Sequence, residues 1–232
     1  MSQVIAIIAA MQPELEYLQH SLQEAQSLEL LGQKCYRGKL AGREVVLALS
    51  GIGKVNAALT TAALLTHFQV QAVINTGSAG GLGAAIRIGD VVIGKETAHH
   101  DVDVSAFGYV HGQVPQLPAR FIAASDLLDA ATQAAGVFAS TVHAGLIVSG
   151  DQFVHGKAQT AAIRAHFPDV AACEMEAAAI AQVCHQAGVP FVVIRAISDH
   201  ADEQAEQSFD EFIALAGRQS AQMVERLLAL LP

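Results

Sequence analysis

Aromatic, basic and cysteine residues are scarce in this sequence of 232 residues, and each shortage excludes a class of protein. With 13 lysines and arginines against 22 acidic residues and no dense basic block, nucleic acid is not an expected partner. Three cysteines without a CxxC pair favour reduced thiols and a cytoplasmic protein over a disulfide scaffold. No apolar run has the length of a membrane span, and the apolar start lacks a leader's basic flank, so we expect a soluble, uncleaved chain.

Apolar residues are abundant, at 52% of the chain, and they occur in a regular order of elements. Strand-like runs rich in β-branched residues alternate with alanine-rich helical patterns along the whole sequence, which is typical of βα units. A chain of this length can bury one sizeable core. We therefore predict an α/β fold with a single domain over residues 1–232.

Local patterns predict several element boundaries. Pro13 suits the first turn of the first helix, and Gly188 suits the end of a later helix. Ser208 and Glu211 form a capping box that we expect at the start of the terminal helix. Residues 99–118 are rich in Gly and Pro without a helical period, which predicts a long functional loop or an interface arm.

Carboxylates follow three of the predicted strands. Glu14 and Glu16 follow the first strand, Glu174 and Glu176 follow "VAAC", and Asp199 follows "FVVIRAIS". Taken singly, an acid in a first helical turn is explained by the helix dipole. Together, at strand ends where ligands bind, paired carboxylates are suited to acid and base chemistry at a glycosidic centre.

Two glycine-rich segments, "GIGK" and "GSAGGLG", have neither the Walker spacing nor the dinucleotide spacing, so we do not expect a nucleotide phosphate site. Close approach of the backbone to a planar or ribosyl ligand and ordinary tight turns both stay open. His99 and His100, with aspartates close behind, do not predict a metal site because adjacent histidines rarely face one ion. We expect neither a metal nor another cofactor.

The ordered motifs resemble the bacterial 5′-methylthioadenosine/S-adenosylhomocysteine nucleosidases, within the purine and uridine phosphorylase superfamily. The resemblance covers nearly the whole chain through "AAMQPELE", "SGIGKVNAA", "NTGSAGGL", "DVDVSAFGY", "LIVSGDQFV", "CEMEAAAIAQVC", "FVVIRAISD" and "SFDEF". It implies a nucleoside phosphorylase-like fold of three α/β/α layers, in which helices flank a mixed central sheet. It also implies hydrolysis of the N-glycosidic bond of 5′-methylthioadenosine and S-adenosylhomocysteine, in methionine salvage and methyl-cycle recycling.

The resemblance also implies a role for each acid. Asp199 would donate a proton to adenine N7, Glu14 would activate the attacking water, and Glu176 would hold the ribose 2′-hydroxyl. Adenine is a poor leaving anion, so its protonation lets it depart neutral while a carboxylate stabilises an oxocarbenium-like ribose. Burial would have to raise the pKa of Asp199 for this role. If the strand persists through this segment, Glu174 faces another direction than Met175, and we assign it a weaker supporting part.

The same resemblance places the remaining pocket residues. Phe153 would stack on adenine, the backbone of Val154 would read its edge, and Ser198 would orient Asp199. The substrate-binding set is Met11, Ile52, Ser78, Phe153, Val154, Met175, Glu176, Arg195, Ser198 and Phe209, of which Met11, Ile52 and Phe209 would line the 5′-alkylthio slot. Phe107 and Pro115 would reach in from a second subunit, which implies a homodimer. His200 is expected to face solvent.

Three other functions stay open at this point. A phosphate-dependent nucleoside phosphorylase shares the fold, but Asn75 stands where that branch has an arginine and Glu14 would repel phosphate. An aminofutalosine hydrolase of menaquinone synthesis would use the same chemistry on a different 5′-substituent. A catalytically inactive nucleoside-binding protein would have lost one of the three key acids, and all three are present.

Overall fold

The computed structural model describes residues 3–136, 138 and 140–231. Its strands are β1 (Gln3–Ala9), β2 (Gln23–Leu30), β3 (Gln33–Leu40), β4 (Arg43–Leu49), β5 (Gln69–Gly81), β6 (Val91–His99), β7 (Phe121–Ile122), β8 (Val142–Ser149), β9 (Val170–Glu174) and β10 (Phe191–Asp199). Its α-helices are α1 (Gln12–Ser21), α2 (Lys54–His67), α3 (Ser125–Ala135), α4 (Lys157–His166), α5 (Ala177–Ala187) and α6 (Ala205–Leu230), with one 3₁₀ turn, η1 (Ser105–Phe107).

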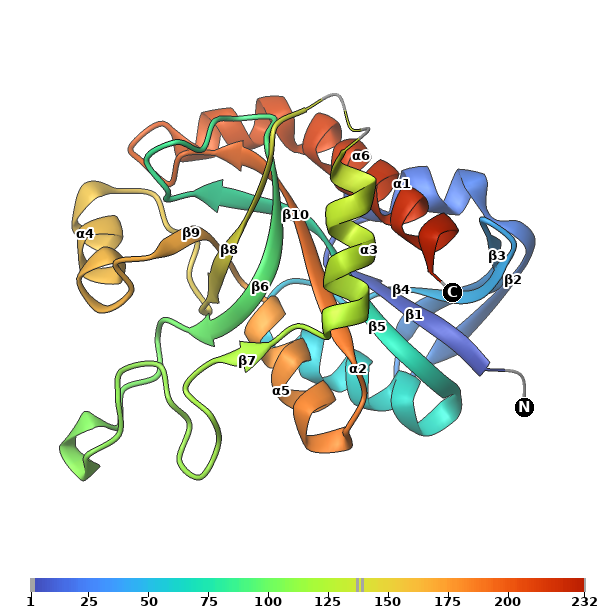
Figure 1. Cartoon of the computed structure of the whole chain (residues 1–232), viewed down its shortest axis with the longest axis horizontal. Helices are drawn as coiled ribbons and strands as arrows, with labels where there is room; N and C mark the ends of the chain where they lie inside the picture. Colours follow the sequence, from blue (N-terminus) through green and yellow to red (C-terminus); the bar gives the residue numbers. More distant parts are fainter. Residues whose placement is uncertain (1–2, 137, 139, 232) are drawn as a thin grey trace.

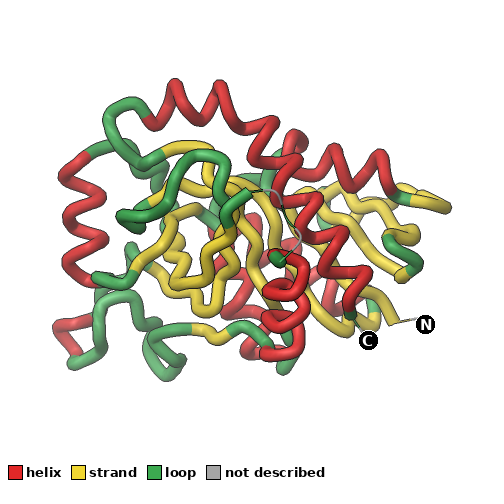
Figure 2. Tube along the Cα trace, turned by 45° about the horizontal axis from the view of Figure 1, so that its top comes forward, coloured by secondary structure: helices red, strands yellow, loops and turns green. Residues whose placement is uncertain are grey.

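All ten strands of the described residues join one mixed sheet, in the order β10-β6-β8-β9-β5-β1-β4-β3-β2, with β7 on β6. Strand β10 also pairs with β5, so β5, β10, β6, β8 and β9 close into a ring, and β1, β4, β3 and β2 extend from β5 as an open sheet. Figures 1 and 2 show helices around these strands, which confirms the expected central mixed sheet flanked by helices.

Strand β1 illustrates how the sequence divides the core. Successive side chains of a strand point to opposite faces, so Ile5 and Ile7 join the core under α1, α3 and α6. Val4, Ala6 and Ile8 join the core under α2 and α5. Both faces of β1 are buried, which explains why its sequence is continuously apolar instead of alternating.

Three boundary predictions meet different outcomes. Pro13 lies in the first turn of α1, and Gly188 ends α5 with a φ of 68°, in the left-handed region, so both predictions are confirmed. The capping box at Ser208 is wrong: α6 begins one turn earlier, at the fully buried Ala205, and the N–H of Ser208 already donates to the carbonyl of Gln204. Burial of Ala205 extends the helix past the polar residues that resembled a cap.

The predicted segment of residues 99–118 is a loop with a single 3₁₀ turn, except that its first residue, His99, still belongs to β6; the absence of a helical period predicted this. Figure 1 shows this segment in green, projecting at the lower left from the body of the sheet. The helix α3 that follows it was not predicted. No helix among the described residues is long and apolar enough to cross a membrane.

Candidate active site

A cavity of about 350 Å³ lies where several strands end. Strands β1 and β10 each pair with β5 in parallel, so the carboxyl ends of all three strands meet at one edge of the sheet. The ends of these strands, the end of β9 and loops after β4 and β8 supply the walls. The lining residues are Ala10, Met11, Glu14, Ile52, Ser78, Ala79, Gly80, Gln152, Phe153, Val154, Cys173, Glu174, Met175, Glu176, Ser198, Asp199 and Phe209.

Glu14 is held by four hydrogen bonds on one wall of this cavity. Its Oε1 accepts from the backbone N–H and the hydroxyl of Ser78, at 2.9 and 2.8 Å, and its Oε2 accepts from the N–H groups of Ala10 and Met11. The side chain is only 1% exposed. All four contacts use acceptor lone pairs, the pattern of an ionised carboxylate whose orientation is fixed.

A glycine makes this arrangement possible. Gly77 has a φ of 151°, and a Cβ atom there would lie 2.7 Å from Glu14 Oε1 and 2.4 Å from Arg195 Nη1. Gly80 is similar, because its Cβ would lie 2.9 Å from Asp199 Oδ1. Both glycines belong to β5 and not to a turn, so close approach of side chains to the backbone accounts for the glycine-rich segment.

Asp199 is the last residue of β10 and lies on another wall of the cavity, 3% exposed. Its Oδ2 accepts a hydrogen bond from the hydroxyl of Ser198 at 2.9 Å, and its Oδ1 accepts one from the N–H of Ala201 at 2.8 Å. Burial raises the pKa of Asp199 above its ordinary value and outweighs these two bonds, which favour the charged form. His200 is exposed, as expected, and the protonated form of its ring would lower the pKa of Asp199.

Arg195, on β10, is buried behind the cavity wall at 1% exposure and is surrounded by acceptors. Its Nη2 donates to Asn75 Oδ1 at 2.7 Å, to Glu174 Oε2 and, at 3.5 Å, to Glu176 Oε2. Its Nη1 donates to the carbonyl of Ser78 at 3.3 Å. The guanidinium is therefore engaged by the protein's own groups.

Glu174 lines the site, and the direction expected for a persisting strand does not apply, because β9 ends at this residue. Strand β9 ends at Glu174, and the chain turns there, which brings Glu174 and Glu176 to the same cavity and the same arginine. Glu176 also accepts a hydrogen bond from the N–H of Gly53 at 2.9 Å. Burial, followed by the charge of Glu174, raises the pKa of Glu176 to about 8, although Arg195 opposes the shift.

The apolar walls come from loops and from α6. Phe153 and Phe209 meet edge to face with ring centroids 5.7 Å apart, and the buried Val154 lies beside them. Ile52, half exposed, and Met11 border the opening. The cavity thus combines two separated carboxyl groups with an aromatic and an aliphatic wall.

Three residues of the expected set, Phe107, Pro115 and Arg195, do not line this cavity. Phe107 is 80% exposed on the projecting segment of residues 99–118, and Pro115 is exposed farther along it. Arg195 also stays off the lining, beneath Glu174 and Glu176. Glu16, the second acid after the first strand, points to solvent.

The last two amides of "GIGK", at the start of α2, bind carboxylates of the protein itself. The N–H of Gly53 donates to Glu176, and that of Lys54 donates to Asp151 Oδ1 at 2.7 Å. The Lys54 ammonium pairs with Asp101 at 2.5 Å. A helix start is a place where phosphate often binds, and here acidic side chains occupy it.

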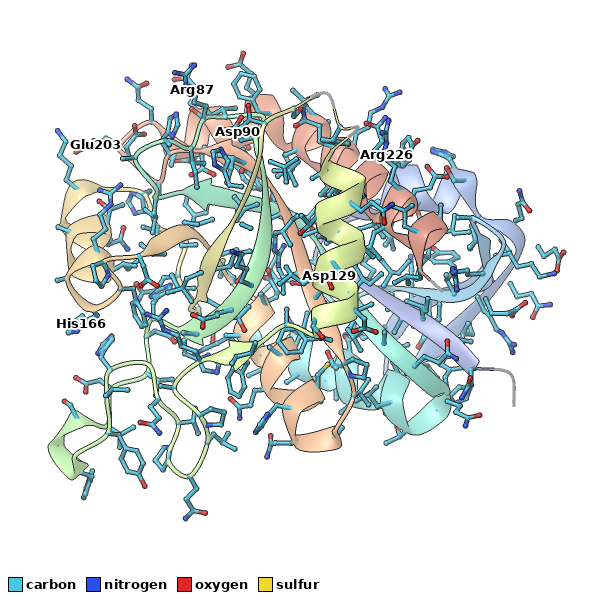
Figure 3. All side chains as sticks on the ribbon, in the orientation of Figure 1. Arg87, Asp90, Asp129, His166, Glu203 and Arg226 are labelled. Carbon is cyan, nitrogen blue, oxygen red and sulfur yellow. The ribbon has the colours of Figure 1, made fainter. Side chains whose placement is uncertain are left out.

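A second cavity of about 200 Å³ is lined by His100, His111 and His166, with Asp101 and Gln152 nearby. Figure 3 labels His166 at the left, at the end of α4. The rings of His111 and His166 stack with centroids 3.8 Å apart. Over residues 3–136, 138 and 140–231, no group of three or more potential ligand side chains has the placement of a metal site.

Sequence reasoning missed five lining residues, most of which have small side chains without distinctive chemistry. They are Ala10, Ala79, Gly80, Gln152 and Cys173. Asn75 holds Arg195 and Ser149 holds Glu174. Asn75 was noted in the sequence only as a difference from the phosphorylases, and Ser149 was not singled out. Their one sequence signal was a polar residue inside an apolar strand, which must find a partner when buried.

The sequence model of the phosphorylase superfamily matches residues 4–229. The chain belongs to this superfamily. A solved 5′-methylthioadenosine/S-adenosylhomocysteine nucleosidase from Neisseria meningitidis, in complex with methylthio-immucillin-A, is 56% identical, with 99% of each chain covered and a TM-score of 0.96. The corresponding nucleosidase from Streptococcus pneumoniae, with a transition-state inhibitor, is 47% identical over 100% of both chains, with a TM-score of 0.96.

A relative with a different activity is also similar. The futalosine hydrolase of Helicobacter pylori is 35% identical, with 97% of each chain covered and a TM-score of 0.93. The higher identities to the nucleosidases, over full length, confirm the family that the sequence motifs indicated.

Proposed function

We propose that this chain is a hydrolase that cleaves the N-glycosidic bond of 5′-methylthioadenosine and S-adenosylhomocysteine, releasing adenine and the 5-thioribose product. The observation that carries the proposal is the pair of buried carboxyl groups, Glu14 and Asp199, on different walls of one cavity. One is surrounded by four hydrogen-bond donors, and the other has a raised pKa. Such a pair supplies a base and an acid at neutral pH.

Asp199 is the acid in this proposal. The raised pKa increases the fraction of Asp199 that is protonated near neutral pH, and Ser198 and Ala201 fix the direction of the carboxyl group. The proton passes to adenine N7 as the bond between C1′ and N9 breaks and its electron pair moves into the base. Adenine then leaves as a neutral molecule, which lowers the barrier to bond cleavage.

Glu14 is the base. A water molecule takes the place of the Ser78 hydroxyl as a donor to Oε1 and is oriented there. Its oxygen forms the new bond to C1′ while one of its protons passes to Glu14. The amides of Ser78, Ala10 and Met11 keep the carboxylate in place during this step. The same negative charge stabilises the oxocarbenium-like ribose in the transition state.

Glu176 and Met175 contact the ribose. Phe153 stacks on adenine, and the backbone of Val154 binds the edge of the base. Met11, Ile52 and Phe209 surround the 5′-substituent. All of these side chains line the same cavity, and the apolar ones lie on its loop and helix walls, as an adenine ring and an alkylthio group require.

A homodimer completes the pocket. The exposed Phe107 and Pro115 lie on a segment that projects from its own subunit and do not line the subunit's own cavity, so a second copy can contribute them. Sedimentation of the protein at assay concentrations tests the arrangement. A dimer is expected, and a fully active monomer would contradict the shared pocket.

Water is favoured over phosphate as the nucleophile. Among the described residues lining the cavity none is a lysine or arginine, and Arg195 behind the wall is held by carboxylates and Asn75. Glu14 stands where phosphate would have to approach, and acidic side chains occupy the amides at the start of α2. An incoming phosphate would meet negative charge and no free cation.

The deciding experiment measures adenine release from 5′-methylthioadenosine in phosphate-free buffer, repeated with phosphate added. Adenine plus free methylthioribose, at a rate indifferent to phosphate, is the expected result. Strict dependence on phosphate would establish a phosphorylase instead. Parallel assays with adenosylhomocysteine, 5′-deoxyadenosine and aminofutalosine rank the substrates, and a marked preference for aminofutalosine would favour the activity of the Helicobacter pylori relative.

A further inference from the structure

Three carboxyl groups surround one buried cation in this site. Glu174 and Glu176 both contact Arg195 Nη2, and Glu14 adds its charge to the same guanidinium. One arginine cannot balance three carboxylates, so the arrangement must determine which of them it pairs with. The contact with Glu174 is the close one, whereas the contact with Glu176 measures 3.5 Å.

Resting on the proposed function, we propose that Glu174 is a positioning residue: it fixes Arg195 and the turn from β9 to α5, and thereby presents Met175 and Glu176 to the ribose. It acts through these neighbours and does not itself react. This gives a specific role to Glu174, for which the sequence indicated only a weaker supporting part.

The first support is the hydrogen bonding of the Glu174 side chain. Its oxygens accept from the N–H of Glu176 at 3.1 Å and from the N–H of Ala177 at 2.9 and 3.1 Å, and the hydroxyl of Ser149 also donates to it. Ser149 in turn accepts from the N–H of Ala178 at 2.8 Å. The first amides of α5 are therefore satisfied by these two side chains, as a helix start requires.

The second support is where this turn lies. Met175 and Glu176 are the two residues between Glu174 and the first residue of α5, and both line the cavity. Glu176 has φ of −133° and ψ of −39°, outside the helix. A side chain that binds the backbone on the far side of a two-residue turn sets the direction of both side chains in it.

The third support is electrostatic. Because Glu174 takes the close contact with Arg195, Glu176 is left with a weaker contact, and burial together with the charge of Glu174 raises its pKa to about 8. Replacing Glu174 by neutral Gln removes a negative neighbour and frees Arg195 for Glu176. Both changes lower the pKa of Glu176.

The test compares Glu174→Gln with the wild-type protein by kcat/KM for 5′-methylthioadenosine, by its pH profile and by adenine binding. We expect kcat/KM to fall about 100-fold, the scale of a misplaced reacting group. An ionised Glu176 stabilises the positive ribose, so activity should rise with pH as Glu176 ionises. Because the variant lowers the pKa of Glu176, this acidic limb of the pH profile should move to lower pH. Adenine affinity should stay unchanged, because the base lies against Phe153 and Asp199.

Nucleoside binding without turnover is measured in the Asp199→Asn background. Adding Glu174→Gln there should weaken 5′-methylthioadenosine but not adenine. An equal loss for both ligands would indicate general collapse of the pocket and overturn the proposal. Wild-type kcat/KM with an unmoved pH limb would overturn it as well.

Two further variants keep the test decisive. Asp90→Asn is the matched control. Asp90, labelled in Figure 3, is a buried carboxyl group paired with His143 at 2.9 Å, and it is not among the residues that line the cavity. This variant should leave kcat/KM and the pH limb unchanged. If Glu174→Gln fails to fold by circular dichroism, Ser149→Ala replaces it, with a smaller loss of kcat/KM and unchanged adenine affinity. A Ser149→Ala variant with wild-type kinetics would then overturn the proposal.

These outcomes are separable from a failure of the proposed function. A wild-type protein that releases no adenine from any 5′-substituted adenosine would remove the proposed hydrolysis itself. If the wild-type protein releases adenine and the Glu174→Gln variant is equally active, only the role of Glu174 is contradicted.

Discussion

Glu14 and Asp199 are buried to nearly the same extent, at 1% and 3% exposure, yet their surroundings differ in the number of hydrogen-bond donors. Four N–H or O–H groups donate to Glu14, whereas two donate to Asp199. With only two donors, burial dominates at Asp199 and raises its pKa. Burial alone therefore does not assign an acid or a base, and the donors around each carboxyl group must be counted.

The variant Asp199→Asn should have the largest effect, and it tests whether Asp199 is the acid of the pair. An amide cannot donate the proton that adenine N7 requires, so kcat should fall by about 10⁴-fold, at the upper end for loss of a general acid. Single-turnover assays check the rate, and circular dichroism checks the fold. Turnover within a few-fold of wild type would remove Asp199 as the acid.

The counterpart at the other wall is Glu14→Gln. The amide keeps the size of the side chain but places an NH₂ group among the four donors and cannot accept a proton from water. We expect a loss of about 10³-fold in kcat with 5′-methylthioadenosine still bound, measured by calorimetry. A fully active variant would end the assignment of Glu14 as the base.

Ser198→Ala sharpens the comparison by removing one of the two donors at Asp199. That bond favours the charged form, so its loss raises the pKa of Asp199 further. Asp199 then stays protonated to higher pH, and the enzyme stays active with it. The alkaline limb of the kcat/KM profile should therefore move to higher pH. Losing the orienting bond should cost about 5-fold at the optimum. An alkaline limb that moved downward would contradict the assignment.

The smallest expected effect comes from His200→Ala. His200 lowers the pKa of Asp199 only when its ring is protonated. The ring faces solvent, where salt screens its charge. The alkaline limb should move slightly upward at low ionic strength and coincide with wild type at high salt. A large change at high salt would mean that His200 contacts substrate.

Much of this site was predictable because its residues follow strands, and strand ends carry ligands in sheets of this kind. The cavity brings together Met11 and Glu14 from the start of α1, Phe153 from the loop after β8 and Asp199 from the end of β10, as the motif order suggested. Their roles remain proposals that the variants above test. Residues such as Asn75, whose amide joins Ile8 to Arg195 inside the sheet, could not be assigned because their partners are distant in sequence.

The errors have a common physical cause. A capping box at Ser208 is a local pattern, and burial of Ala205 overrode it. The direction of Glu174 was inferred from strand alternation, but the strand ends at that residue. The pairing of β10 with β5, which closes the ring, depends on contacts between residues 191–199 and 73–80 and has no local signature.

The closed ring also bears on solubility at high concentration. Closure at one end of the sheet leaves β2 as the long unpaired edge among the described strands, and an open edge can recruit strands from other molecules. β2 has exposed polar residues, a register shift between Gln23 and Gln26, and Glu24 paired with Lys39 of β3. A bulged, charged edge strand of this kind disfavours pairing with a strand of another molecule. The polar sequence of β2 therefore protects the open edge of the sheet against edge-to-edge association.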